Sequence, residues 1–228
     1  MFFSRTASAW KLSSGSFFAR LESMGFYSKH ILPRMLEWSL GRSEVREHRR
    51  STLAPLQGRV LEIGFGTGLN LDCYPERVTA LTAIDCETMM PARIAERIAR
   101  VQIPVERMNH TAGVPLPFES ESFDGIVTTF TLCSIDDVAA ALSEIRRVLK
   151  PEGEYVFLEH GRSDDPRISK NQDRFNPITR LIGCGCNMNR PIDKLISAAG
   201  LQIVKLDRFV LADSPRMLGA VYQGIAHQ

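Results

Sequence analysis

The stretch Val60–Asn70, VLEIGFGTGLN, and the acid that follows it in LTAIDCE at 81–87 decide how this chain folds. The first residues are apolar, as in a buried parallel strand. Three glycines then follow at alternating positions: Gly64, Gly66 and Gly68. Glycines at such a turn let a ligand lie close to the main chain. Asp85 ends a second expected strand, about 20 residues further on, where a carboxylate usually binds ribose hydroxyls. The pattern predicts a cradle for a nucleoside-bearing ligand.

The charges around this cradle favour one class of ligand over another. A dinucleotide fingerprint has the spacing G-x-G-x-x-G, whereas the spacing here is one residue shorter. Glu62 precedes the turn, and its carboxylate would repel a pyrophosphate but attract an ammonium or sulfonium group. Asn70 and Asp72 fall in the first turns of a helix expected after the glycines. These features favour S-adenosylmethionine as the cofactor.

Four ordered blocks of sequence carry a resemblance to a known family. They are LEIGFGTG, AID, LPFESESFDGIVTTFTLCSIDD and EIRRVLKPEGEYVFLEH. Over about Arg59–Gln228 the chain resembles class I S-adenosylmethionine-dependent methyltransferases, and it is similar to their ubiquinone/menaquinone-biosynthesis-like group. The segments TLCSI, LEH and GCNMNR resemble the small thiol methyltransferases. The resemblance implies an α/β fold with a seven-stranded Rossmann-like sheet, an antiparallel last strand and an N-terminal helical extension.

Length and charge suggest one decorated domain. The 228 residues suit a single domain with additions. Residues 1–59 carry ten Lys/Arg and four Asp/Glu, a net charge of +6, and the remainder carries −4, which together give the overall +2. We expect an extension at 1–23, a helical lid at 24–58 and a methyltransferase domain at 59–228. The basic start favours an anionic surface or substrate near that end, although a solvated helix face has the same signature.

The N-terminal residues leave localisation open. Residues 1–23 have Arg, Lys and Ser and no acid before Glu22, as in an organelle transit peptide, and Met24 is an alternative start. Helical periodicity extends from Tyr27 to Leu56, and the first helix has its apolar residues on one stripe. Gly41 is expected to end this helix, and Ser43 is the expected N-cap of a second one. Residues 1–42 are thus both basic and amphipathic, which fits either a lid or peripheral membrane contact. Without an apolar run of about 20 residues, we expect a cytoplasmic protein, with membrane association and organelle targeting as alternatives.

Further cofactor contacts are expected at two strand ends. Backbone groups of Thr129 and Phe130 are expected where the fourth strand ends, at the switch point of the sheet. Further on, Asp136 or Asp137 is expected to cap a helix, Lys150–Gly153 to form the turn before the fifth strand, and Gly200 to end the helix that Pro191 begins. The family pattern has an acidic or amide residue near the end of the third strand, which bonds the adenine amino group. Here Ala112 and Gly113 offer only backbone groups, and Asn109 is a substitute.

His160 and Glu159 are the candidate catalytic residues. Both follow the fifth strand, beside the expected methyl position. Methyl transfer needs an aligned nucleophile and exclusion of water, and a base only when the acceptor is protonated. A histidine pKa near ~6.5 suits proton removal, but His160 could instead orient a loop, and Glu159 could act electrostatically. Arg180 and Arg190 could hold an anionic group of the acceptor or simply lie on the surface.

The five cysteines predict neither a disulfide framework nor a metal site. They lie at 73, 86, 133, 184 and 186, without a CxxC pair, and read as reduced cytosolic thiols. Cys184 and Cys186, with no histidine nearby in the sequence, are too few ligands for zinc. No metal is therefore expected, and Cys133 reads as a small buried apolar residue.

The function predicted from these features is methyl transfer from S-adenosylmethionine to a small-molecule or lipid-like acceptor. A thiol is favoured, followed by a phospholipid amine or a quinol. The alternative is a noncatalytic S-adenosylmethionine-binding module with a scaffold role. A nucleic-acid acceptor is not expected, because the chain lacks an N/D-P-P-Y/F motif and a basic surface with interleaved aromatic residues outside its first segment.

Overall fold

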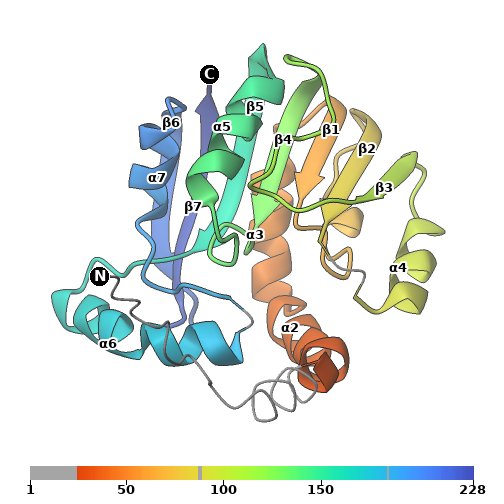
Figure 1. Cartoon of the computed structure of the whole chain (residues 1–228). Helices are drawn as coiled ribbons and strands as arrows, with labels where there is room; N and C mark the ends of the chain where they lie inside the picture. The colour runs from red at the N-terminus through yellow and green to blue at the C-terminus, as the bar shows by residue number, and fades with distance from the viewer. Residues whose placement is uncertain (1–24, 87–88, 184) are drawn as a thin grey trace, which may run out of the picture.

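The computed structural model describes residues 25–86, 89–183 and 185–228. Its seven strands form one sheet in the order β3-β2-β1-β4-β5-β7-β6 (Figure 1). The strands are β1 (Gly58–Ile63), β2 (Val78–Asp85), β3 (Val105–Asn109), β4 (Phe123–Thr129), β5 (Leu149–His160), β6 (Gln202–Val210) and β7 (Ala220–His227). β7 runs antiparallel to both β5 and β6, and the other neighbours that pair are parallel. The predicted fold class is confirmed.

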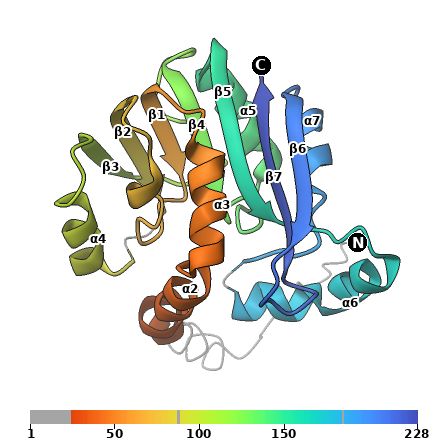
Figure 2. The ribbon, with the colours of Figure 1, turned by 180° about the vertical axis from the view of Figure 1, so that it is seen from behind.

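Helices cover both faces of the sheet and the end at which the parallel strands finish. α5 and α7 lie on one face, and α3 lies on the other (Figures 1 and 2). The helical elements are η1 (Tyr27–Ile31), α2 (Leu32–Leu40), α3 (Ser43–Leu53), η2 (Leu71–Cys73), α4 (Pro91–Ile98), α5 (Val138–Val148), α6 (Pro166–Ile182) and α7 (Ile192–Ala198). α2 and α6 both lie beyond the carboxyl ends of the parallel strands. In open α/β sheets this is the end where ligands bind.

The two larger of three buried apolar clusters in the described residues lie on opposite faces of the sheet. The larger one joins α5 and α7 to the sheet through residues such as Leu142, Ile145 and Ile196, all fully buried. The other joins α3 and η2 to the opposite face through Leu53 and Leu71. Removing this much apolar surface from water stabilises the layers and fixes the strand ends relative to one another.

Local signals place most elements correctly, and Asp137 illustrates why. Its side chain accepts a hydrogen bond from Ala140 N at 3.0 Å, so it caps α5 as expected. Before α3, in contrast, the capping position belongs to Arg42, one residue earlier than the expected Ser43. Gly41 ends α2 and Gly200, with φ of +81°, follows α7, as the sequence predicts.

Two predicted elements differ in the structure. The helix expected after the glycine turn is only the short 3₁₀ turn η2, because Pro75 follows within two residues and its preceding residue Tyr74 is extended. The turn expected at Lys150–Gly153 is instead part of β5, which begins directly after α5. The division of the chain at residues 23 and 58 stays a prediction, and residues 1–24 lie outside the described residues.

Candidate active site

The glycine turn and Asp85 form one connected end of the predicted cradle. Gly66 N donates to Asp85 Oδ2 at 2.7 Å, so the loop after β1 and the tip of β2 are held together. Gly64, Gly66 and Gly68 have φ values of +81°, +56° and +79°, which favour glycine. A Cβ built on Gly66 would meet no atom within 4 Å. The loop therefore presents open backbone beside a carboxylate, as a nucleoside site requires.

Glu62 lies beneath this loop and not at its surface. It is 1% exposed, and Asn70 Nδ2 donates to Oε1 at 2.8 Å while Tyr74 OH donates to Oε2 at 2.7 Å. Asn70 is equally buried and also donates to Thr129 Oγ1 at 3.0 Å. The structure thus brings the predicted residues Glu62, Asn70 and Thr129 together in one polar network at the floor of the cradle.

Arg49, from α3, completes this network and was missed by sequence reasoning. Its Nη1 donates to Asn70 Oδ1 at 2.7 Å and to Thr129 Oγ1 at 2.8 Å. The side chain is 4% exposed, its guanidinium lies 5.4 Å from the Phe130 ring centroid, and its Nε has no partner among the described residues. The sequence EVREHRR at 44–50 has three arginines, and nothing in it distinguishes Arg49 from the other two. Arg49 is buried only because α3 packs on the sheet.

Burial of opposite charges shifts both pKa values at the floor. Burial raises the pKa of Glu62 to about 7, against the hydrogen bonds from Tyr74 and Asn70 that lower it. Burial lowers the pKa of Arg49 to about 10, partly offset by the Glu62 charge. An arginine held this way remains charged at neutral pH, with one donor left to bind a carboxylate.

A second missed contact ties α2 to the glycine loop. Thr67 Oγ1 donates to Glu37 Oε2 at 2.6 Å, and Arg97 of α4 donates to Thr67 O at 2.7 Å. Arg97 also pairs with Glu37, whose pKa is lowered because these hydrogen bonds and charges outweigh its burial. α2 is thereby joined to the glycine loop and to α4, and its role as a lid stays a prediction.

The positions predicted to contact adenine lie at and just after the end of β3, beside the tip of β2. β2 and β3 pair so that Asp85 lies beside Asn109, whose side chain is exposed at the strand end. Ala112 forms an isolated bridge with Val114, and Gly113 has φ of +97°. These positions are close enough in sequence and register to Asp85 for the predicted contacts, which stay predictions.

The turn after β4 is held by Glu159 from β5. Glu159 is fully buried, and its Oε2 accepts from Thr131 N at 2.8 Å and Leu132 N at 3.1 Å. Phe130 has φ of +54°, and its amide donates to Leu158 O at 2.8 Å. Burial raises the pKa of Glu159 to about 8. Its position favours holding the turn over direct contact with an acceptor.

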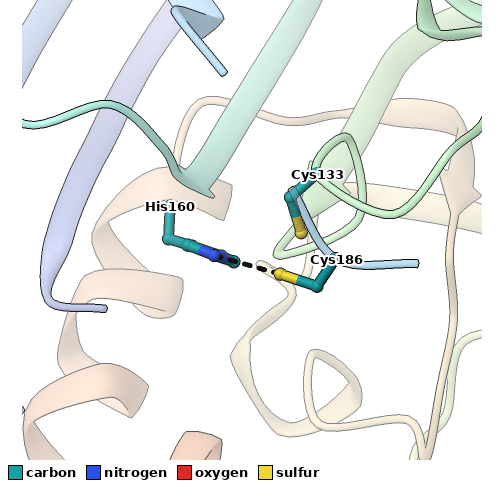
Figure 3. A group of neighbouring side chains, drawn as sticks. All are labelled: Cys133, His160 and Cys186. Atoms are coloured by element: carbon teal, nitrogen blue, oxygen red, sulfur yellow. Dashed lines mark hydrogen bonds between the residues drawn. The ribbon is translucent and has the colours of Figure 1, made fainter. Parts of the chain in front are cut away.

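Three residues from different segments converge next to this turn (Figure 3). Cys133 follows β4, His160 ends β5, and Cys186 lies in the loop after α6. Cys186 Sγ lies 3.2 Å from His160 Nε2, and the three potential ligand atoms lie within 4.8 Å of one another. The sequence argument that no histidine accompanies Cys186 was therefore wrong, since folding supplies His160. Cys184 lies outside the described residues.

Each group in this cluster alters the protonation of the others. A hydrogen bond from Cys186 and the charge of His160 hold the pKa of the Cys133 thiol well below its ordinary value, despite burial. The same hydrogen bond raises the pKa of Cys186. Burial disfavours the imidazolium of His160, but the Cys133 charge outweighs that effect and raises its pKa. Cys133 is 2% exposed, as expected for a buried residue, but it is also part of a polar cluster.

The loop that carries Cys186 is tied to the turn that carries Cys133. Asn187 donates to Cys133 O from its backbone at 2.8 Å and from Nδ2 at 3.1 Å. Arg190 donates to Leu132 O. Arg190 thus has a structural contact in addition to its predicted role with anions, whereas Arg180 is exposed.

The described residues fit a methyl donor with an amino-acid end and a nucleoside end. Arg49 Nε is buried without a partner among the described residues, as expected of a group that awaits a carboxylate. Open backbone at Gly66 lies beside Asp85, which suits a ribose. When bound, S-adenosylmethionine supplies an electrophilic methyl group, and these side chains orient its two ends.

Comparison with known proteins finds a matching domain and several relatives. Residues 61–157 match a family described as a methyltransferase domain. The chain is 37% identical over 120 residues to phosphatidylethanolamine N-methyltransferase of Cereibacter sphaeroides, covering 51% of this chain and 59% of that protein. It is 31% identical over 150 residues to human thiol S-methyltransferase TMT1A, covering 64% and 61%. The chain thus spans about three fifths of the length of these two relatives.

Solved structures support the same assignment at the level of the fold. One is a 1,6-didemethyltoxoflavin-N1-methyltransferase from Burkholderia thailandensis with bound S-adenosylhomocysteine, with a TM-score of 0.64 and 17% identity. The match covers 97% of this chain and 93% of that one. Together, the comparisons show that residues 61–157 match a methyltransferase domain and that the chain has the fold of solved methyltransferases.

Proposed function

We propose that this protein transfers a methyl group from S-adenosylmethionine to a small-molecule or lipid-like acceptor, and that the acceptor is a thiol. The observation that carries the proposal is the buried network of Glu62, Asn70, Thr129 and Arg49 beneath the glycine loop. This network leaves the Nε–H group of Arg49 to bind the carboxylate of S-adenosylmethionine, while Asp85 lies at the other end of the cradle. A donor fixed at both ends has its methyl group oriented for in-line attack.

The choice of a thiol is supported by the surroundings of the cradle. Human TMT1A, a relative, is named a thiol S-methyltransferase. The turn after β4 and the end of β5 carry Cys133 and His160 beside the cradle, so polar groups are at hand where an acceptor loses its proton. Direct proton removal by His160 is one route, and it stays a prediction. Phospholipid amines and quinols follow as acceptors, the first because another relative is named for phosphatidylethanolamine.

A membrane surface is proposed as a second partner. No helix in the described part of the chain is long and apolar enough to cross a bilayer. Exposed apolar residues nevertheless lie on η1 and α2, and further ones on α6, at the same end of the molecule as the carboxyl ends of the parallel strands. An interfacial location would bring a lipid-like acceptor to the site. We propose a cytoplasmic enzyme that associates with such surfaces, and organelle targeting by residues 1–23 stays a prediction.

The test is formation of S-adenosylhomocysteine by the purified chain on a panel of thiols, lipid amines and quinols. We expect turnover with a thiol, and a loss of donor affinity of at least about tenfold in Arg49→Met, because a buried charged hydrogen bond is worth about 1.5–3 kcal/mol. Arg50→Met is the matched control, since Arg50 lies next in the same helix but is exposed.

Two outcomes would contradict the proposal. Tight binding of S-adenosylhomocysteine in calorimetry, with no methyl transfer to any acceptor, would support the alternative of a noncatalytic binding module. Equal donor affinities for the Arg49→Met and Arg50→Met variants would show that the buried network does not hold the donor.

A further inference from the structure

Cys133, His160 and Cys186 form a set of ligands of the kind that binds zinc. Two thiols and an imidazole lie with their ligand atoms within 4.8 Å of one another. In a tetrahedral zinc site, bonds of about 2.0–2.3 Å place neighbouring ligand atoms about 3.5–3.8 Å apart. The 3.2 Å separation between His160 Nε2 and Cys186 Sγ is already close to that value. Small side-chain rotations would therefore bring all three atoms to a common centre.

The backbone that carries the three ligands is fixed in place. His160 is the last residue of β5 and pairs with Val221 of β7. Cys133 lies in the turn that Glu159 holds through the amides of Thr131 and Leu132. The loop with Cys186 is joined to the same turn by two hydrogen bonds from Asn187 to Cys133 O. Ligands held by such outer contacts need little ordering when a metal binds.

Apart from the contacts within the cluster, the Cys133 thiol has only weak partners among the described residues. Cys133 Sγ lies 3.8 Å from Phe130 O and 3.5 Å from Ser134 Oγ, which are weak sulfur contacts. The cluster also lies beside the donor cradle, because Thr131 Oγ1 is 3.5 Å from Gly64 O. A structural role alone would not require two thiols and an imidazole to meet at this point.

We propose that Cys133, His160 and Cys186 bind one zinc ion, whose fourth position receives the sulfur of the acceptor. A Cys₂His set with an open position is typical of catalytic zinc sites, and soft thiolate with imidazole ligands suits zinc. His160 then acts as a metal ligand in place of the direct proton acceptor. This inference deepens the proposed function and rests on its thiol acceptor.

The transfer step balances with the donor as the only co-reactant. The acceptor thiol releases its proton to solvent as its sulfur binds zinc, because a coordinating thiol is deprotonated by the metal. A lone pair of that sulfur forms a bond to the donor's methyl carbon. The bond between this carbon and the donor sulfonium breaks, and its electron pair stays on the donor sulfur. The product thioether, a neutral and weaker ligand, is replaced by the next thiol.

The first test is the metal content of the full chain, produced with added zinc and purified under reducing conditions. We expect about one zinc ion per chain in the wild type. Cys186→Ser and His160→Ala should each lower zinc affinity by at least about tenfold, the loss already seen when only outer contacts are removed. Cys86→Ser is the control, because Cys86 is an exposed cysteine outside the cluster and should leave the zinc content unchanged.

Calorimetry with S-adenosylhomocysteine on the same samples shows whether each variant is folded. A variant that binds this compound normally but holds no zinc supports the proposal. The proposal is overturned if the reduced wild-type protein contains no zinc, whether or not Cys133 and Cys186 form a disulfide when the same sample is later oxidised. Retention of zinc by both Cys186→Ser and His160→Ala overturns it as well.

Cobalt substitution then tests the open position separately from the overall function. The cobalt-loaded chain should show a thiolate-to-cobalt absorption band that changes when a small thiol such as 2-mercaptoethanol is added. No change on adding the thiol overturns the acceptor role. If thiols are methylated by zinc-free protein, the inference fails and the proposed function stands. If zinc binds and the cobalt band responds but no thiol is methylated, the metal site stands and the proposed function fails.

Discussion

At the scale of single residues, Glu62 and Arg49 are two opposite charges buried beneath the glycine loop. Each charge loses hydration, and each is compensated by the other and by neighbouring polar groups. The hydrogen bonds from Tyr74 and Asn70 satisfy the carboxylate, but Arg49 Nε is unpaired among the described residues. The donor-free site therefore carries an unfavourable term that a bound carboxylate would relieve.

The Glu62 pKa predicts a pH-dependent difference in stability. Because the folded pKa, about 7, exceeds the ordinary 4.5, the folded chain binds more protons than the unfolded chain between these values. The contribution of Glu62 to stability is therefore fully present below about pH 4.5 and is lost as pH rises to about 7. We expect the unfolding free energy of the wild type, relative to Glu62→Gln, to fall by about 1–3 kcal/mol between pH 5 and pH 8. Urea denaturation at both pH values measures this, and parallel profiles would refute it.

Residues in the glycine turn could be predicted from the sequence, whereas those of the floor and the thiol cluster could not. Glu62, the glycines and Asp85 are separated by short intervals along a strand–turn–strand unit, so local pattern suffices. Arg49 reaches the site only because α3 packs across the sheet. His160 meets Cys186 only because β5 and the loop after α6 converge. Such encounters depend on tertiary packing, to which spacing in the sequence gives no access.

At the scale of elements, α2 contacts the glycine loop through the carboxylate of Glu37. Glu37 accepts from Thr67 of the loop and pairs with Arg97 of α4, so three segments meet at a single carboxylate. The group is largely buried, with 14% of the Glu37 side chain exposed. Ion pairs with this degree of burial and several hydrogen bonds contribute more than exposed ones.

Removing this carboxylate should loosen the loop and weaken donor binding. We expect Glu37→Ala to lower the affinity for S-adenosylhomocysteine by about fivefold to 30-fold, equivalent to about 1–2 kcal/mol. Glu96→Ala provides the control, because Glu96 pairs with Arg100 on the exposed face of α4 and does not contact the loop. Calorimetry measures both, and equal affinities would mean that α2 does not stabilise the cradle.

Elements were predicted well where one signal governed them and poorly where two competed. The apolar residues before Asp85 predicted the position of β2 to within one residue of its observed bounds, Val78–Asp85. After the glycine turn, the family's usual helix competed with Pro75, and the proline limited it to η2. At Lys150–Gly153, the turn residues competed with pairing of β5 beside β4, and the strand begins before them at Leu149.

At the scale of the whole molecule, apolar residues gather at the end that holds the site. Exposed apolar side chains lie on two parts of this end, the segment from residue 26 to the end of α2 and the helix α6. They are Phe26, Ile31, Met35, Trp38, Phe175, Ile178, Leu181 and Ile182. Both helices lie beyond the carboxyl ends of the parallel strands. Exposed apolar groups in this number on one end are characteristic of an interaction surface.

We expect this end to bind lipid vesicles. Trp38→Ser combined with Ile178→Ser should lower sedimentation with phosphatidylserine-containing vesicles several-fold, because a fully buried apolar side chain contributes about 1.5–3 kcal/mol. Val204→Ser is the matched control, since Val204 is similarly exposed but lies on β6. Identical sedimentation of the double variant and the control would exclude this surface.

The close packing of Gly64 against Thr131 has a consequence for how this enzyme can change. Any side chain at position 64 would collide with Thr131, so the donor-side bend and the acceptor-side bend move as one piece. Mutations that change the shape of residues 131–134 to admit a new substrate are therefore expected also to weaken binding of S-adenosylmethionine. Diversification of substrate choice should instead accumulate at exposed positions of α6, such as Ile178 and Leu181, because the loop after α6 is itself tied to that turn.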